Sequence, residues 1–332
     1  MITTASPAAP HRTAPRRLLA AAVGAVLVAG LGVTAAGPAS AAGYESTPYG
    51  FAAGTTGGAG GTTSTVTTLA ALKTAVAGTA KKTVYVSGSI ALTGQVDVGS
   101  NTSVIGVGAS SGLTGGGLRV KNSTNVVLRN LRISKAVGTD AITIQASTKV
   151  WVDHNDLSSD LTHDKDYYDG LLDITHGSDN VTASWNYFHD HYKVSLVGHS
   201  DSNASEDTGK LHVTYAHNWF NNVNSRLPSV RFGTAHVYSN YYTNVSDGAV
   251  HSRMGAQVLV ERNTFVGGFE SVTTTGDSKT DGYVNLYRND LGATTTNITG
   301  TGTFSAASYA YDPTGADTVA AVDTAGAGTG RI

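Results

Sequence analysis

Two arginines stand close together in the segment SRLPSVRFG, which spans residues 225–233. Arg226 and Arg231 lie five positions apart, with Pro228 between them. Proline has no backbone N–H and is rare inside a regular strand, so a cationic pair around it is unusual for a purely structural segment. The segment is therefore a candidate binding or catalytic site, and the question is what its two charges face.

Three aspartates occupy strand-like segments earlier in the chain. Asp140 begins the stretch TDAITI, and Asp169 and Asp173 belong to the stretch DGLLDIT. In an extended strand, residues 169 and 173 point to one side, whereas Leu172 and Ile174 point to the other. Carboxylates gathered on one face repel one another unless a cation joins them, and such hard oxygen ligands suit Ca²⁺. The pattern leaves two interpretations open, which are a calcium site and three solvated surface acids.

A repeated phrase predicts the elements that position these residues. The pattern apolar-x-apolar-x-x-Asn-x-aromatic occurs in KVWVDHNDL, NVTASWNYF, HVTYAHNWF, AQVLVERNTF and GYVNLYRNDL, and more loosely in NVVLRNLRI and AHVYSNYY. Its asparagines are Asn130, Asn155, Asn186, Asn218, Asn240, Asn263 and Asn289. Unequal spacings of this size are typical of a coil of short strands whose loops carry insertions. We therefore expect a parallel β-helix with stacked asparagines and aromatic residues; a β-sandwich explains the alternation but not the repeated phrase.

The flanking segments complete a single-domain, all-β prediction. Residues 44–100 are interpreted as a lead-in to the coil, in which residues 68–78 form a short amphipathic capping helix and residues 81–90 contain the first strand. Residues 292–332 carry little pattern, and we expect them to form a tail packed outside the coil. The chain has no cysteine, so its stability must come from a large buried core rather than disulfides.

The N-terminus predicts export. Three arginines, Arg12, Arg16 and Arg17, precede an uncharged run that ends in small residues, which indicates a signal peptide over residues 1–41 and a mature domain over residues 42–332. A membrane anchor is the alternative, and the adjacent arginines leave twin-arginine export open. Removing the signal takes away three arginines and no acids, so the formal charge moves from −2 to −5. We expect a secreted monomer that binds neither nucleic acid nor, after cleavage, a membrane.

Several phrases together resemble one enzyme family. WVDHN, DGLLDITHGSDNVTASWNYF, HYKVSLVG and above all RLPSVRFG are similar to the pectate lyases of polysaccharide lyase family 1, of the secreted bacterial type. The similarity runs from about residue 49 into the AGAGTG stretch of the tail, and so covers nearly the whole mature domain. It implies a right-handed parallel β-helix, secretion, and calcium-dependent cleavage of polygalacturonate by β-elimination.

The resemblance also implies a role for individual residues. Asp140, Asp169 and Asp173 match the calcium-binding acids, and Arg226 matches the catalytic base. The substrate-binding cations are matched by Lys193, Arg231 and Arg253. Asp169 replaces a glutamate of some members, and Gly138 replaces a further calcium-binding aspartate, which puts a secondary calcium position in doubt.

The implied reaction makes chemical sense of the charges. A base removes the proton on C5 of galacturonate, negative charge spreads into the adjacent carboxylate, and the bond to O4 breaks. A cation on that carboxylate neutralises the developing charge. Arginine is normally protonated, so crowding by other positive charges and an alkaline medium would both favour its neutral form. The alternative for Arg226 is a carboxylate clamp, with water or hydroxide as the base.

Three rival functions remain open at this point. A polygalacturonate hydrolase would use paired carboxylates, yet no Asp-Asp pair occurs in the chain. A pectin lyase for methyl-esterified substrate would not need the three acids. A non-catalytic β-helical polysaccharide-binding protein would have no use for the combination of acids, lysine and paired arginines.

Overall fold

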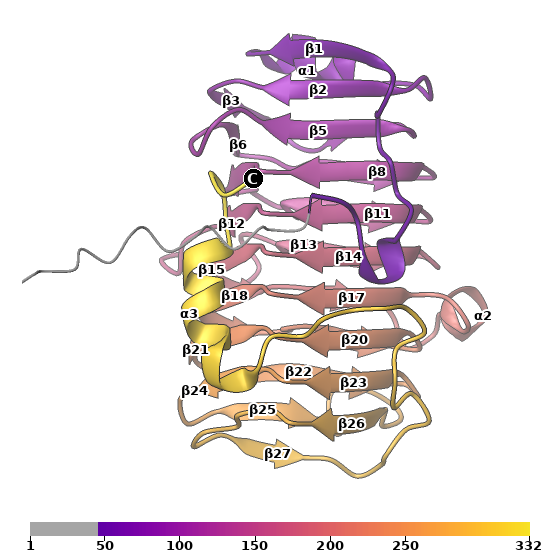
Figure 1. The fold of residues 1–332 in the computed structure, drawn as a ribbon, viewed down its shortest axis with the longest axis vertical. Helices are drawn as coiled ribbons and strands as arrows, with labels where there is room; N and C mark the ends of the chain where they lie inside the picture. The colour runs from indigo at the N-terminus through magenta and orange to yellow at the C-terminus, as the bar shows by residue number, and fades with distance from the viewer. Residues whose placement is uncertain (1–45) are drawn as a thin grey trace, which may run out of the picture. The chain divides into compact units, whose positions relative to one another are not determined.

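Residues 46–332 are described by the computed structural model, and they form a parallel β-helix (Figure 1). Each coil passes through three parallel sheets in turn, so that a strand pairs with the equivalent strand of the next coil. The predicted signal peptide lies outside the described residues. Among the residues that are described, no helix is long and apolar enough to cross a membrane.

The three sheets contain ten, eight and nine strands. The ten-stranded sheet consists of β1 (Thr62–Val66), β2 (Lys82–Val86), β5 (Thr102–Gly106), β8 (Thr124–Arg129), β11 (Thr148–Asp153), β14 (Asp179–Ser184), β17 (His212–Ala216), β20 (Thr234–Tyr238), β23 (Gln257–Glu261) and β26 (Tyr283–Tyr287). The eight-stranded sheet consists of β3 (Ser89–Ala91), β6 (Gly112–Thr114), β9 (Arg132–Ser134), β12 (Asp156–Ser158), β15 (Tyr187–Lys193), β18 (Trp219–Ser225), β21 (Tyr241–Val245) and β24 (Thr264–Val266). The nine-stranded sheet consists of β4 (Val96–Asp97), β7 (Leu118–Lys121), β10 (Ile142–Gln145), β13 (Leu172–Thr175), β16 (Leu196–Val197), β19 (Ser229–Arg231), β22 (Gly248–Arg253), β25 (Glu270–Thr273) and β27 (Thr295–Asn297).

The predicted asparagine ladder stands at the corner between the ten-stranded and eight-stranded sheets. From Asn155 to Asn289, each side-chain Nδ2 donates to the Oδ1 of the next asparagine at 2.9–3.0 Å. Each backbone N–H donates to that same oxygen. Buried amides that would otherwise lack partners are thereby satisfied on every coil, which is why the phrase repeats.

Asn130 departs from the prediction by one position. The residue before each ladder asparagine has a left-handed backbone, for example His154 with φ 51° and Trp185 with φ 52°. In the NVVLRNLRI copy, Asn130 itself takes this conformation, with φ 57°, and the N–H of Leu131 donates to Asn155 Oδ1 at 3.0 Å. Asparagine tolerates the left-handed region better than most residues, so it serves the corner here rather than the ladder.

The aromatic ladder is confirmed inside the coil. The rings of Phe188, Phe220, Tyr242 and Phe265 stack with centroids 4.4–4.9 Å apart, and all four side chains are buried. Leu157 pairs with Phe188 and extends the same row. Aromatic rings at equivalent positions of successive coils fill the core closely, in a chain that has no disulfides.

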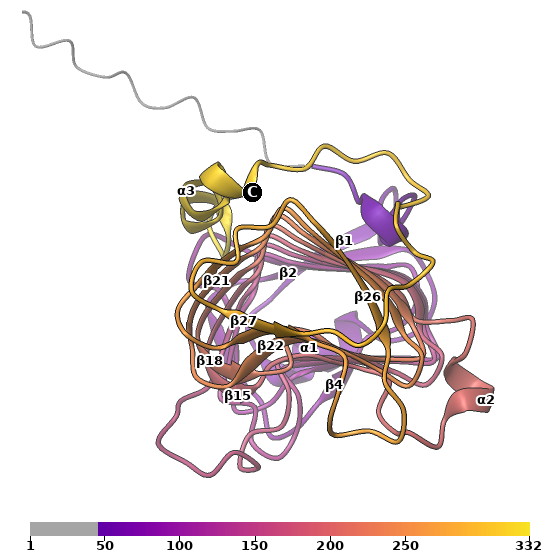
Figure 2. The same ribbon diagram turned by 90° about the horizontal axis from the view of Figure 1, so that it is seen from below.

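The ends of the coil differ from the prediction in detail. The capping helix α1 (Leu69–Ala75) is present; its first turn is capped by the Thr68 hydroxyl, and Leu72 is buried in the core. Figure 2, seen along the stack, shows α1 behind the interior of the coils. The first strand, however, is β1, ahead of the predicted one, so the lead-in already belongs to the coil.

The C-terminal tail packs outside the coil, as expected, but it is more ordered than its composition suggested. It contributes β27 to the nine-stranded sheet and then forms α3 (Ala316–Gly326) beside β21 and β24 (Figure 1). Val319 of this helix is buried, and Oδ1 of Asp323, also in this helix, lies 3.1 Å from Nδ1 of His217. The remaining short helices are η1 (Gly50–Ala52) and α2 (Ala204–Asp207).

Candidate active site

The arginines of the SRLPSVRFG segment lie on the nine-stranded sheet and its corner with the eight-stranded sheet. Arg226 directly follows β18 and has a left-handed backbone, with φ 63°. Pro228 stands in the same corner, just before β19, where no ladder N–H is required of it. Arg231 ends β19 and pairs directly with Arg253 at the end of β22. Stacking of coils thus brings together cations that are distant in the sequence.

Two of the three predicted calcium ligands converge on one glycine. The Gly170 N–H donates to Asp140 Oδ1 at 2.8 Å. A Cβ added to Gly170 would stand 2.4 Å from Asp173 Oδ1 and 2.9 Å from Asp140 Oδ1. Only glycine therefore leaves room for both carboxylates, which form a concave, oxygen-lined cradle.

The electrostatics of this cradle are those of two uncompensated acids. Asp140 and Asp173 each retain 8% exposure. Burial raises the pKa of Asp140, although hydrogen bonds from Thr143 and Gly170 oppose the change. Burial, together with repulsion from Asp140, raises the pKa of Asp173 well above its ordinary value, and the Arg226 charge acts in the opposite direction. A bound cation would compensate the negative charges of these two carboxylates.

Asp169 is oriented differently from these two acids. The strand that was expected to carry both Asp169 and Asp173 begins only at Leu172, so strand alternation does not relate the two residues. The Asp169 side chain is 53% exposed and lies 3.2 Å from Lys193 Nζ, which also contacts Asp166 at 2.7 Å. In the part of the chain that is described, no three acidic or histidine side chains already form a metal-binding cluster.

The two arginines predicted to bind substrate, Arg231 and Arg253, form hydrogen bonds and ion pairs with other residues of the protein. Arg231 Nε contacts Asp201 Oδ1 at 2.6 Å, and Arg231 Nη1 donates to the Gly198 carbonyl at 3.0 Å. Arg253 is 5% exposed, and its Nη1 donates to the Asp277 carbonyl at 3.3 Å. Burial lowers the pKa of Arg253 to about 10, and the charges of Arg231 and Arg226 contribute to that shift.

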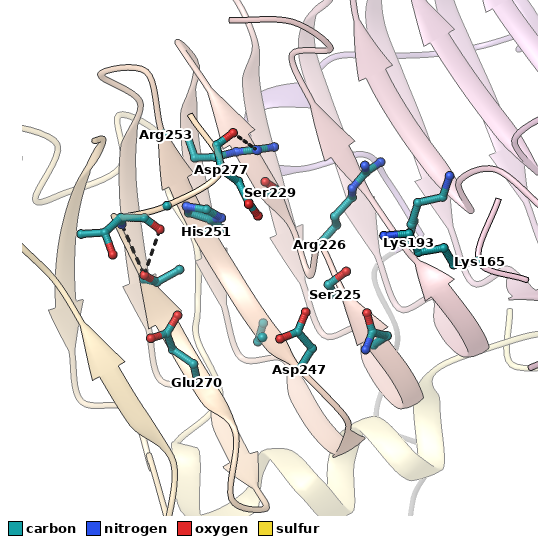
Figure 3. Close-up of a pocket in the computed structure, with 16 residues that line it drawn as sticks. Lys165, Lys193, Ser225, Arg226, Ser229, Asp247, His251, Arg253, Glu270 and Asp277 are labelled. Carbon is teal, nitrogen blue, oxygen red and sulfur yellow. Dashed lines mark hydrogen bonds between the residues drawn. The ribbon is translucent and has the colours of Figure 1, made fainter. Parts of the chain in front are cut away.

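A groove joins these elements along the sheet (Figure 3). Lys193, Arg226 and Arg253 line it, whereas Asp140, Asp169, Asp173 and Arg231 are not among its lining residues. The sequence interpretation missed other residues of the lining, among them Lys165, Ser229, Asp247, His251, Glu270 and Asp277. His251 could have been found, because it lies two positions before Arg253 and so shares its face of the strand.

The comparisons with known proteins agree with this geometry. A family model described as pectate lyase matches residues 16–331. The chain belongs to the pectate lyase family. It is 51% identical over 277 residues to pectate lyase A of Emericella nidulans, covering 82% of this chain and 83% of that protein. It is also 51% identical over 287 residues to pectate lyase B of Colletotrichum gloeosporioides, covering 85% and 86%.

Solved structures of pectate lyases share the fold. A Bacillus pectate lyase in complex with trigalacturonate is 32% identical, with a TM-score of 0.78 over 86% of this chain and 99% of that one. Pectate lyase II of Xanthomonas campestris is 28% identical, with a TM-score of 0.74 over 86% and 98%. The relatives at about half identity are fungal, so the bacterial type that the sequence predicted is not supported. As a pectate lyase, the protein is a polysaccharide lyase.

Proposed function

We propose that the protein cleaves the α-1,4 bonds of unesterified polygalacturonate by calcium-dependent β-elimination, with Arg226 as the base. The observation that carries the proposal is the position of Arg226, which lines the groove together with Lys193 and Arg253. Its positive charge also acts to lower the pKa of Asp173 in the acid cradle. This shared lining supports a role for Arg226 as the base and for Lys193 and Arg253 as carboxylate-binding cations. The trigalacturonate complex of the Bacillus relative supports the substrate class.

The proton transfer and bond cleavage balance without a redox partner. Arg226, in its neutral form, takes the C5 proton of a galacturonate unit. The electron pair left on C5 forms the C4–C5 double bond as the C4–O4 bond breaks, and the departing O4 acquires a proton from solvent. Lys193, Arg231 and Arg253 stabilise the substrate carboxylates through fixed positive charge. Removal of the C5 proton by a base is favoured in an alkaline medium, so an alkaline optimum is expected.

Calcium fits the acid cradle by charge, ligand type and space. Asp140 and Asp173 would supply oxygen ligands on either side of Gly170, and Asp169 would complete the set by exchanging its contact with Lys193 for the cation. When bound, Ca²⁺ supplies a positive charge that makes the proton next to the substrate carboxylate more acidic. A bound cation would oppose the rise in the pKa values of these two carboxylates, which burial and nearby acids cause.

Export follows from the N-terminal pattern and suits the substrate. We infer that residues 1–41 are removed as a signal peptide and that residues 42–332 act outside the cell as a monomer on a polysaccharide too large to enter it.

The test is the ultraviolet absorbance of the unsaturated product, measured with polygalacturonate in calcium and in a chelator. We expect the absorbance to rise only in the presence of calcium. For Arg226→Lys, the rate of this rise should be at least about a thousandfold lower than for the wild type. The Arg288→Lys variant is the matched control, because Arg288 is exposed, directly follows β26 at the far end of the coil and, like Arg226, has a left-handed backbone, with φ 52°. New reducing ends without absorbance would show hydrolysis; neither signal would favour a binding protein.

A further inference from the structure

Asp201 joins three segments that are distant in the sequence. It lies in the loop between β16 and α2, and its side chain is 17% exposed. Its Oδ1 accepts hydrogen bonds from Arg231 Nε at 2.6 Å and from the Ser278 hydroxyl at 2.9 Å. Its Oδ2 accepts one from the Lys279 N–H at 2.9 Å. One carboxylate therefore ties the end of β19, and the loop between β25 and β26, to the loop that carries Asp201.

The contact with Asp201 fixes one edge of the Arg231 guanidinium group. Arg231 Nε donates to Asp201, and Nη1 donates to the Gly198 carbonyl. Among the described residues, Arg231 Nη2 has no hydrogen-bond partner, so its two N–H groups stay available to a ligand. A guanidinium group that is held at one edge loses less conformational freedom when it binds a carboxylate than a free one does.

The loop between β25 and β26 extends the influence of Asp201 to Arg253. Asp277 directly precedes the two loop residues that donate hydrogen bonds to Asp201. The Asp277 carbonyl accepts the hydrogen bond from Arg253 Nη1 (Figure 3). Asp277 and Arg253 both line the groove, whereas Asp201 is not among its lining residues. Asp201 therefore acts on the groove through the residues that it holds.

Asp201 also supplies a negative charge next to these cations. Burial acts to raise the pKa of Asp201, but hydrogen bonds from the three residues that it joins lower it to about 2, so the carboxylate is ionised at neutral and alkaline pH. Burial and the charges of Arg231 and Arg226 lower the pKa of Arg253, and the charges of Asp277 and Asp201 oppose this change. Asp201 thus helps to keep Arg253 protonated.

We propose that Asp201 is a positioning residue of the lyase site, which holds Arg231 and the Arg253-binding loop in the arrangement that receives substrate carboxylates. The proposal rests on the lyase function proposed above and adds how two of its substrate-binding cations are oriented. Because Asp201 does not line the groove, its loss should weaken substrate binding rather than slow bond cleavage.

Two substitutions of Asp201 test the proposal. Asp201→Asn keeps an oxygen acceptor but removes the charge, and Asp201→Glu keeps the charge but moves it by one methylene group. Asp97→Asn is the matched control, because Asp97 accepts hydrogen bonds from Arg119 Nε at 2.5 Å and Nη2 at 2.9 Å on the same nine-stranded sheet, and neither residue lines the groove. Thermal unfolding confirms that each variant is folded.

Kinetics on polygalacturonate in calcium should separate binding from cleavage. We expect Asp201→Asn to raise KM about tenfold and to change kcat less than about twofold. The KM of Asp201→Glu should lie between those of Asp201→Asn and the wild type, and Asp97→Asn should match the wild type in both constants. A purely structural role would change the thermal stability of Asp201→Asn without this selective rise in KM.

The pH dependence of KM provides an independent readout. Arg253 has a pKa of about 10, so the wild-type KM should rise as the pH approaches that value. In Asp201→Asn the rise should begin at lower pH, because a charge that favours protonated Arg253 is absent. His251 stays neutral over this range, since burial, followed by the nearby Arg253 charge, lowers its pKa to about 4.

Binding can also be measured without turnover. Isothermal titration with trigalacturonate in calcium, on the Arg226→Lys background, should give a Kd about tenfold weaker when Asp201→Asn is added. An unchanged KM and Kd would overturn the proposal, and tighter binding would show that Asp201 competes with substrate for Arg231. Failure of the lyase function is distinguishable, because the wild type would then form no unsaturated product while the titration still measures the effect of Asp201.

Discussion

Replacing Asp173 by asparagine should stabilise the calcium-free protein while removing its response to calcium. Asp173 and Asp140 share the cradle around Gly170 and are both almost fully buried. The Oδ1 atoms of Asp173 and Asp140 lie 2.4 Å and 2.9 Å from the position that a Cβ on Gly170 would take. The two oxygens are therefore at most 5.3 Å apart, which is the sum of these two distances. Asparagine keeps an Oδ1 that can accept the hydrogen bond from the Leu196 N–H, which is 3.0 Å long in the wild type. The substitution therefore removes a charge and little else.

The magnitude follows from Coulomb's law. Two unit charges at this separation repel by about 3 kcal/mol at an effective dielectric constant of about 20, and more weakly if one is partly protonated. The folded protein raises the pKa of Asp173 well above that of an unfolded chain. The unfolded state therefore releases its proton first, and the free energy of unfolding falls as the pH rises above about 4. The gain from Asp173→Asn should be near zero at pH 4 and roughly 1–3 kcal/mol at alkaline pH.

Thermal unfolding in a chelator, at acidic and alkaline pH, measures this gain. For a chain of this size, 1 kcal/mol corresponds to roughly 2–4 °C in apparent Tm, so the variant should unfold several degrees above the wild type at alkaline pH only. Added calcium should raise the Tm of the wild type, and of an Asp312→Asn control at an exposed acid of the tail between β27 and α3, much more than that of the variant. A variant that is less stable than the wild type in chelator, or equally stabilised by calcium, would refute the reasoning.

Two further predictions concern the scaffold. Asn218→Ala removes two hydrogen bonds donated to Ala183 and Asn240 and two accepted from Asn186, so it should lower the free energy of unfolding by roughly 3–5 kcal/mol in a urea titration. Asn289→Ala, at the half-exposed last rung, should cost about 1–2 kcal/mol, and equal losses at the two positions would contradict the ladder. His191 contacts the Asp169 carbonyl at 2.8 Å and the Ser159 hydroxyl at 2.6 Å, and burial lowers its pKa to about 4. An unfolded histidine binds its proton below about pH 6.5, so the stability that His191 contributes should be lost as the pH falls from about 6.5 to about 4. Tm measured across this range should fall less steeply for His191→Gln than for the wild type, and parallel curves would exclude this role for His191.

Much of the fold could be predicted because its stabilising contacts repeat. Each coil bonds to a copy of itself, so Asn155 and Asn186 need the same neighbours, and the same residue types recur in the chain. The stack of aromatic rings that contains Phe188 and Phe220 could be predicted for the same reason. The cap formed by α1 also follows from a local amphipathic pattern. Arg226, Arg231 and the three aspartates were singled out from the sequence itself, whereas the roles of all seven site residues came from the family resemblance and stay predictions.

The tertiary structure decided what depends on register and on packing between distant segments. Asn130 serves a corner instead of the ladder, because a single residue shifts the copy that contains it. Helix α3 forms in a segment with little pattern, because the outer face of the coil covers Val319.

The site shows the same division between composition and position. The sequence by itself determined that Asp140, Asp173 and Arg226 are present in a repeating coil of strands. Only the stacking of coils decided that two acids meet at Gly170, that Asp169 turns to Lys193, and that Arg226 and Arg253 line one groove. Arg231 and Arg253 are distant in the sequence and pair only because one coil lies on the next, so the positive charge that they share is a property of the folded chain.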